Sequence, residues 1–232
     1  MSPTLIITIS IVTLISVVIL NKMLPEIKFW KPRETRIHTI LGWAQASGLE
    51  YSVEPNYTML ASVVRFECFR QGAKRHFPLS IWGTYRGYTF IAGDFRYLGE
   101  ERSDLGRRIS YDFSFVLFVP PFLLREFVVR RETTADRRRA RWGRNDIDFE
   151  SAEFSDHFFV DCDDRRWAYD AISPRTMELL LANPSIELEC APSMLLIRYP
   201  TQWRGPEFER LANLGVEFLN NIPPHARHPL PA

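Results

Sequence analysis

The chain has 232 residues, of which 46% are hydrophobic, and a formal net charge of +1. This length can bury one core or two small lobes. The balanced charge gives no whole-chain attraction to nucleic acid or to lipid, so we expect no nucleic-acid partner. The three cysteines are widely spaced and form no CxxC pair, which argues against a disulfide framework and against a zinc ribbon. We therefore expect reduced, mostly structural cysteines and no cofactor.

Residues 1–24 predict a transmembrane anchor. The run from Thr4 to Leu20 contains twelve Ile, Leu or Val residues and no charge. As a helix, its length is near the minimum needed to cross the hydrocarbon core of a bilayer. A cleaved signal peptide would need a basic start and a small-residue cleavage site, and a buried helix of a soluble fold would show a polar face. Basic side chains follow the run and none precedes it. The sequence therefore predicts a single-pass cell-membrane protein whose C-terminal domain is cytoplasmic.

The rest of the chain predicts an α+β fold, with an antiparallel sheet and helices in one or two small lobes after the N-terminal transmembrane helix. Residues 25–36 predict a juxtamembrane linker, in which Pro25 and Pro32 break helix. The α+β domain is expected over 37–225, with a β-rich part at 52–132 and an α+β part at 147–222. The proline-rich residues 226–232 are expected to form a loose tail.

A helix is expected from about Arg33 to Ser47, with an apolar stripe and a closing Gly48. Four segments then predict strands of an antiparallel sheet of four or five strands. The alternating run "SVVRFECFR" comes first, two runs flank Arg86-Gly87 as a hairpin, and "RISYDFSFVLFV" repeats with period two. "REFVVRRE" is a further expected strand. The aromatic side chains of these runs, Trp82 among them, could line a groove, although cross-strand packing explains them more simply.

The second half predicts mixed structure. "HFFV" is expected to be a short strand, and residues 165–171 a short helix. Ser173 followed by Pro174 is typical of a helix start. "IELEC" and "MLLIRY" predict a hairpin around Ala191-Pro192-Ser193, and "GPEFERLANLGVEFLNN" predicts a long amphipathic helix.

One cluster of chemically capable side chains lies in "HFFVDCDDRR", where His157 precedes Asp161, Cys162, Asp163 and Asp164. A metal-dependent hydrolase could use His157 and Asp161–Asp164, but the spacing matches neither a zinc nor a calcium motif. Acids at a helix start satisfy free N–H groups, so we favour a capping role, with Arg165 and Arg166 available as ion-pair partners. Cys162 could be a nucleophile beside a helix start, although its acidic neighbours oppose thiolate formation.

Residues 125–144 contain eight arginines and three acids, whereas residues 145–164 contain eight acids and no base. The two blocks can neutralise each other within the fold. The alternative is a basic loop that faces anionic headgroups beneath the anchor. The residues expected to make that contact are Arg137, Arg138, Arg139 and Arg141.

Two stretches, "GTYRGYTFIAGDFRY" and "HFFVDCDDRRWAYDAISPRTMELLL", resemble an uncharacterised family of bacterial proteins that have one N-terminal membrane anchor and a domain of unknown function. The second stretch matches a family phrase at ten positions between Phe158 and Glu178. The resemblance implies an anchor and an α+β body, and it brings no catalytic residue. The Arg-rich segment departs from the family pattern.

We therefore expect a membrane-anchored protein with a non-catalytic binding or scaffolding domain at the inner membrane face. Its expected partners are the membrane itself and another membrane-associated protein. The alternatives are an anionic-lipid-binding domain that uses residues 125–144 and the hydrolase described above.

Overall fold

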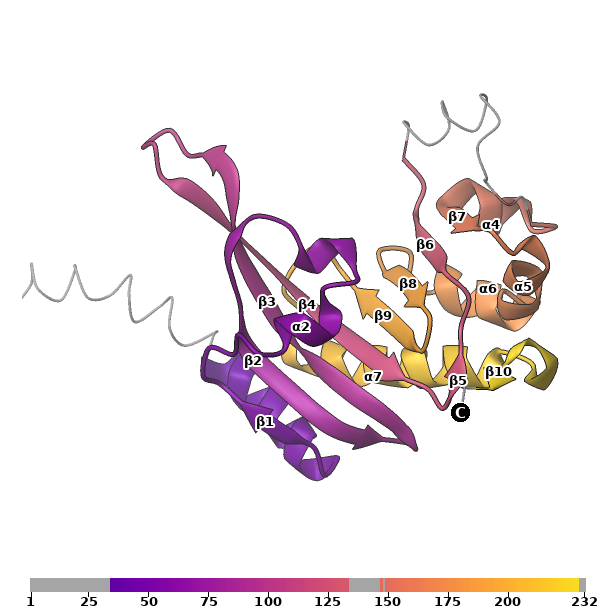
Figure 1. The fold of residues 1–232 in the computed structure, drawn as a ribbon, viewed down its shortest axis with the longest axis horizontal. Coiled ribbons are helices and arrows are strands. Elements are labelled where there is room, and N and C mark those ends of the chain that lie inside the picture. The colour runs from indigo at the N-terminus through magenta and orange to yellow at the C-terminus, as the bar shows by residue number, and fades with distance from the viewer. Residues whose placement is uncertain (1–33, 134–146, 148, 230–232) are drawn as a thin grey trace, which may run out of the picture.

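The computed structural model describes residues 34–133, 147 and 149–229. The expected anchor at 1–24 and the four arginines at 137–141 lie outside these residues. Within the described part, an eight-stranded sheet has the order β1-β2-β3-β4-β9-β8-β6-β7, and every neighbouring pair is antiparallel. Helices pack on this sheet (Figure 1). The α+β class and the antiparallel sheet are therefore confirmed.

The first four strands form a meander. β1 is Glu50–Ser52, β2 is Ala73–Tyr85, β3 is Tyr88–Arg102 and β4 is Arg108–Val119. Arg86 and Gly87 join β2 to β3 with φ values of 47° and 89°. Two successive positive φ angles are typical of the hairpin turn that matches strand twist. The predicted hairpin is confirmed, and the predicted strand at 108–119 has the bounds of β4.

The second half of the chain contributes strands to the same sheet. β6 is Phe127–Arg131, β7 is Phe158–Cys162, β8 is Glu187–Ala191 and β9 is Met194–Arg198. β9 pairs with β4, and β6 lies between β8 and β7. The β8–β9 hairpin is the last part of this sheet along the chain, yet it lies between strands that precede it in sequence. The parts expected at 52–132 and 147–222 share one sheet.

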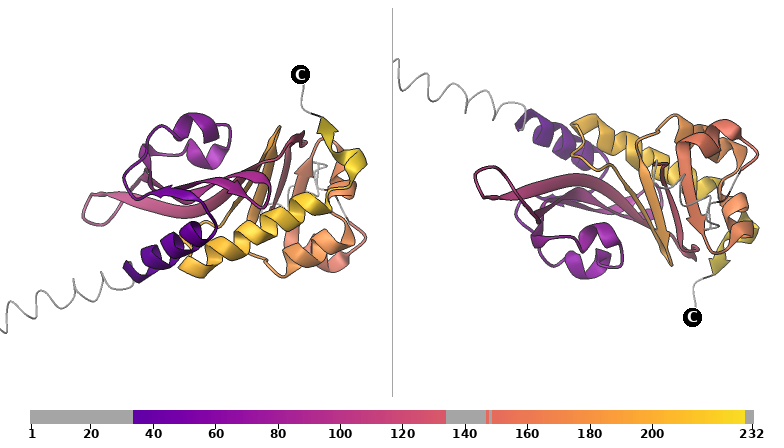
Figure 2. Two further views of the ribbon diagram at one scale, coloured as in Figure 1. Left: turned by 90° about the horizontal axis from the view of Figure 1, so that it is seen from below. Right: turned by 90° about the horizontal axis from the view of Figure 1, so that it is seen from above.

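Helices cover one face of this sheet. A helix over residues 34–46 and α7 (Gly205–Asn221) lie on the same side (Figure 2). Three short helices, α4 (Ala152–His157), α5 (Arg165–Ala171) and α6 (Pro174–Leu181), complete the core near β6 and β7. Ile40 and Ala44 are fully buried here, and Gly48 follows the first helix with a φ of 69°. The predicted stripe and its glycine stop are confirmed.

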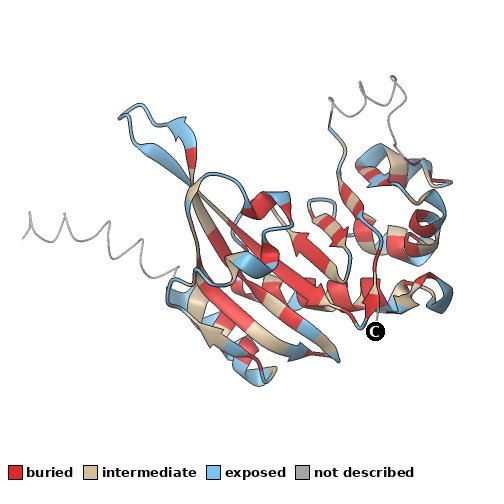
Figure 3. Cartoon of the chain, in the orientation of Figure 1, coloured by how far each residue is buried: buried red, intermediate tan, exposed pale blue. Residues whose placement is uncertain are grey.

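The opposite face is covered by residues 53–72, which we call the cover segment. This segment contains α2 (Leu60–Val63) and a 3-10 helix, η1 (Glu67–Phe69). The prediction of a strand for "SVVRFECFR" was wrong. Helical turns instead bury Val63, Phe66 and Phe69 against an aromatic layer on the sheet, formed by Phe77, Phe95, Phe113 and Phe115. Figure 3 shows buried residues along the central strands beneath this segment.

The C-terminal residues are also packed. After α7, a 3-10 helix η2 (Pro224–Ala226) leads to β10 (His228–Pro229), which pairs with β5 (Phe122–Leu123). The indole Nε1 of Trp167 donates to the carbonyl of Ala226 at 2.9 Å. The loose tail expected at 226–232 was therefore wrong for residues 226–229. A carbonyl that accepts a bond from a buried indole ties this segment to the core.

Candidate functional site

The acidic cluster at the end of β7 is a helix start. Asp164 is the N-cap of α5, and its Oδ1 accepts from the backbone N–H of Trp167 at 3.0 Å. The second carboxylate oxygen lies 3.5 Å from the Nε of Arg125. This pair joins the basic block to the acidic block, whereas Arg165 and Arg166 were the expected partners. The capping interpretation of Asp164 is confirmed, as is the N-cap role of Ser173 in α6.

His157 does not join this cluster. It is the last residue of α4 and not the start of the strand, and its Nδ1 lies 2.7 Å from the carbonyl of Glu153. The strand expected from His157 begins one residue later, because β7 starts at Phe158. Across the part of the chain that the structure describes, no three His, Cys, Asp or Glu side chains are placed to hold a metal ion. The geometry therefore gives no support to the metal-dependent hydrolase.

Burial opposes thiolate formation at Cys162. Burial raises the pKa of this thiol, and its neighbours Asp164, Asp163 and Asp161 raise it further, while a hydrogen bond to the backbone of Asp164 lowers it. A nucleophilic cysteine needs the opposite environment, which is electropositive and partly exposed. The arrangement favours the structural role.

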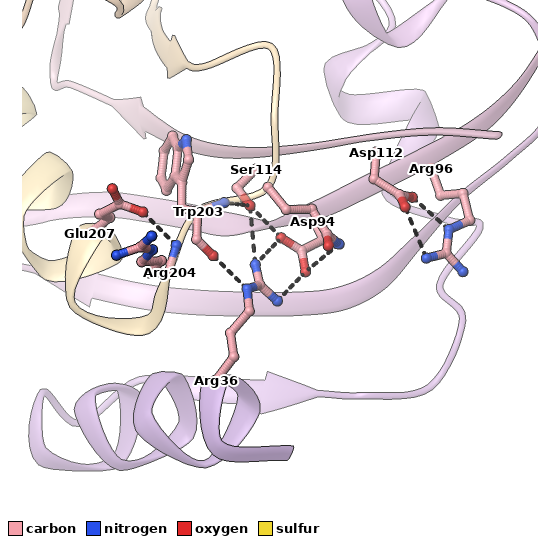
Figure 4. A network of polar contacts seen from close by, with 9 residues as sticks. Arg36, Asp94, Arg96, Asp112, Ser114, Trp203, Arg204 and Glu207 are labelled. Atoms are coloured by element: carbon pink, nitrogen blue, oxygen red, sulfur yellow. Dashed lines mark hydrogen bonds and ion pairs between the residues drawn. The ribbon is translucent and has the colours of Figure 1, made fainter. Parts of the chain in front are cut away.

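A buried polar network joins the helix over 34–46 to the sheet (Figure 4). The guanidinium of Arg36 donates to both oxygens of Asp94 on β3, each at 2.8 Å, and to Ser114 Oγ on β4 at 3.2 Å. Ser114 Oγ also donates to Asp94 at 2.5 Å and accepts from the backbone N–H of Trp203 at 2.9 Å. Arg36 Nε donates to the carbonyl of Trp203. Asp94 is 2% exposed, so this network fixes three elements with charge-assisted bonds.

The network continues into the start of α7. The side chain of Glu207 accepts from the backbone N–H of Arg204. A Cβ atom placed on Gly205 would lie 2.6 Å from the side chain of Thr39 in the first helix. Only a residue without a side chain permits this approach. The start of α7 and the helix over 34–46 are therefore held together at the point where the chain enters the domain.

The opposite face of the sheet carries an apolar pocket of about 530 Å³ beside the cover segment. Trp82 on β2 and Ile91 on β3 lie directly opposite each other on its floor, and Met59 of the cover segment forms a wall. Thr84 and Thr89 form the next pair on the same face of the hairpin, two residues further towards the turn. Of the aromatic residues considered for a groove, only Trp82 and Phe90 line this pocket. The ring of Phe90 is fully buried, so Phe90 contributes its backbone.

A second, charged pocket of about 240 Å³ lies on the other side of the cover segment. Its floor holds Glu187 and Arg198, which form an ion pair, and Glu189. Burial raises the pKa of Glu189, the nearby Arg198 lowers it, and Glu67 and Glu187 raise it further. Carboxylates and a guanidinium in one hollow suit a small polar group.

One row of the sheet connects the two pockets. In this row Trp82 lies opposite Ile91, Ile91 opposite Leu117, Leu117 opposite Leu196, and Leu196 opposite Glu189. Residues directly opposite each other point to the same face of the sheet. Three strand spacings separate Ile91 from Glu189, which is about 14 Å. Sequence reasoning could not find this row, because its members come from five strands whose pairing crosses the chain order.

No family model and no curated protein matches this sequence. One solved structure does match, the crystal structure of the mycobacterial trehalose monomycolate transport factor A, TtfA. The TM-score is 0.52 at 14% sequence identity, and the match covers 84% of this chain and 97% of that chain. The two chains therefore share a fold over nearly the whole of TtfA. Among residues 34–133, 147 and 149–229, no helix has the length and apolar content to cross a membrane.

Proposed function

We propose that this chain is a membrane-anchored, non-catalytic binding protein that takes part in the transport of a lipid. The observation that carries the proposal is the fold shared with a trehalose monomycolate transport factor across 97% of that protein. The metal-site geometry that a hydrolase would need is missing from the described cluster. Two pockets on one sheet face offer binding surfaces instead.

The Arg36–Asp94 network would orient the domain relative to the proposed anchor. In this proposal the apolar run from Thr4 to Leu20 is the anchor, and the domain lies in the cytoplasm. The first described helix begins at residue 34 and is bonded through Arg36 to β3, to β4 and to Trp203, just before α7. A rigid joint this close to an anchor would hold the domain in a limited range of orientations. An anchored domain also meets its membrane partners at a raised effective concentration.

The test is genetic and biochemical, in cells of the source organism. After deletion of the gene, pulse-labelled lipids are followed between membrane fractions. We expect a labelled lipid to accumulate where it is made, and the full chain to restore its distribution. A chain reduced to residues 34–232 should fail, and the same residues behind an unrelated single-span anchor should succeed. An unchanged lipid distribution in the deletion strain would overturn the transport proposal.

Anchoring itself is tested separately. Membranes are washed with alkaline carbonate, which removes peripheral proteins, and the full chain is expected to stay in the pellet. Protease added to the outside of intact spheroplasts should leave the C-terminal domain uncut. Release by carbonate, or digestion from outside, would contradict the anchor or its orientation.

A further inference from the structure

The apolar pocket has a built floor and wall. Trp82 pairs with Glu50 on one side and Ile91 on the other, and Ile91 pairs in turn with Leu117. The centre of the floor therefore has no free strand edge to which a peptide could add. The volume of about 530 Å³ falls in the range of small-molecule sites.

The side-chain oxygen and the backbone of Asn56, which lines the pocket, are already hydrogen-bonded within the chain. The side-chain oxygen of Asn56 accepts from the backbone and hydroxyl of Thr58 at 2.9 and 2.8 Å. The backbone of Asn56 exchanges two hydrogen bonds with Phe77. No charged side chain lines the pocket. A charged group of a ligand would therefore lose its water contacts here without an ionic partner, whereas a hydrocarbon has no such contacts to lose.

The segment that walls the pocket also exposes apolar side chains. Among the described residues, six large hydrophobic side chains are exposed, and three of them belong to residues 53–64: Val53 at 52%, Tyr57 at 62% and Val64 at 45%. Tyr57 directly follows Asn56, which lines the pocket, so at least one of these exposed side chains belongs to the pocket's wall segment.

We propose that the apolar pocket binds one alkyl chain of a membrane lipid. This inference rests on the lipid role proposed above and names the part of the lipid that the domain holds. Trp82, Ile91 and Met59 contact the chain, and the cover segment forms the side through which it enters.

The test uses the full chain in phosphatidylcholine nanodiscs with palmitic acid that carries a diazirine near its methyl end. After illumination, the labelled peptides are mapped by mass spectrometry. We expect label within residues 53–64 and 80–92. Thr89→Trp fills the pocket from an exposed position and should reduce this label about tenfold, as a loss of affinity of that size would. Ser110→Trp makes the same kind of change at an exposed site in β4 and should change it less than twofold.

Thermal unfolding of both variants checks that they fold, and Thr84→Trp replaces Thr89→Trp if that variant does not. Label confined to residues outside 53–64 and 80–92, or full label in the folded tryptophan variant, would overturn the inference. Cross-linked pairs of chains would show that a second copy fills the pocket, with the same consequence. If Thr89→Trp restores the lipid distribution in cells, the transport proposal stands and the pocket is not needed for it. If the pocket is labelled but the deletion strain shows no lipid defect, the pocket binds an alkyl chain without the transport role.

Discussion

The guanidinium of Arg36 binds both carboxylate oxygens of Asp94 at 2.8 Å, although 58 residues separate them in the sequence. The side chains are 16% and 3% exposed. Two charges taken out of water this far are stable only as a pair, and loss of one partner leaves the other uncompensated.

Asp94→Ala should therefore lower the free energy of unfolding by about 3–5 kcal/mol, measured by urea denaturation. Hydrogen exchange in residues 34–46 should rise in parallel, because the first helix loses its bond to the sheet. Glu217→Ala is the matched control. It breaks the exposed pair with Arg175, whose atoms lie 3.1 Å apart, and should cost less than about 1 kcal/mol. Equal effects of the two substitutions would contradict a structural role for the buried pair.

Gly215 marks the closest approach of α7 to the sheet. A Cβ atom there would lie 2.2 Å from the ring of Phe118 on β4. Gly215→Ala should destabilise the domain by about 1–3 kcal/mol, as overpacking of a core does. Gly42→Ala, in the first helix, meets nothing within 4 Å and should stabilise it by about 0.5–1 kcal/mol. Thermal melts of both variants suffice, and a stable Gly215→Ala would show that α7 can move away from β4.

Asp164→Ala removes the N-cap of α5 and should cost about 1 kcal/mol. Asp161→Ala, an exposed acid on β7, should change stability by less than about 0.5 kcal/mol. Zinc and magnesium should raise the melting temperature of neither the parent nor the variants. Metal-dependent stabilisation that disappears in Asp161→Ala would instead revive the hydrolase interpretation.

The thiols of the folded chain should be inert. Cys68, Cys162 and Cys190 are free and buried. Burial raises the pKa of Cys68 to about 12 against the partial opposition of Arg198, so only about one part in 10⁴ is thiolate at pH 8. A thiol reagent such as Ellman's should react with three groups per chain in denaturant and react far more slowly without it. Rapid native reaction at one cysteine would identify an accessible thiolate.

The same shift of Cys68 predicts a pH dependence. A folded-state pKa above the unfolded value of about 9 contributes stability that is fully present below pH 9. That contribution should be lost as the pH rises from 9 towards 12. Cys68→Ala should weaken this alkaline decline of the unfolding free energy, and an unchanged decline would assign it to other groups.

Local sequence patterns correctly predicted the elements that depend on interactions between residues close together in the chain. The Arg86-Gly87 turn, the period-two run of β4 and the Ser173-Pro174 helix start each depend on neighbours within a few residues. The strand prediction for residues 62–70 was wrong. These residues alternate like a strand, but their apolar side chains pack on an aromatic layer made by strands that are distant in the sequence. The prediction of a loose tail was wrong for Ala226–Pro229. Composition alone does not reveal that Trp167 donates a hydrogen bond to this segment and that Phe122 pairs with it.

The candidate sites were harder still. Asp94 and Ser114 read as polar positions within strands, and nothing near them in the sequence points to Arg36. The apolar pocket is defined by what the cover segment leaves open, which depends on the course of that segment over the sheet. The exposure of Val53, Tyr57 and Val64 is known only from the structure, so it offered no signal in the sequence.

The place of the β8–β9 hairpin in the sheet has a consequence during synthesis. β4 ends at Val119, and its partner β9 begins at Met194, 75 residues later. At ribosomal rates of about 5–20 residues per second, this edge of β4 waits roughly 4–15 seconds for its neighbour. The waiting edge runs through Phe115 and Phe118 and is open to pairing with other nascent chains. Chaperone capture of the nascent chain over this interval would protect an edge that the finished sheet hides.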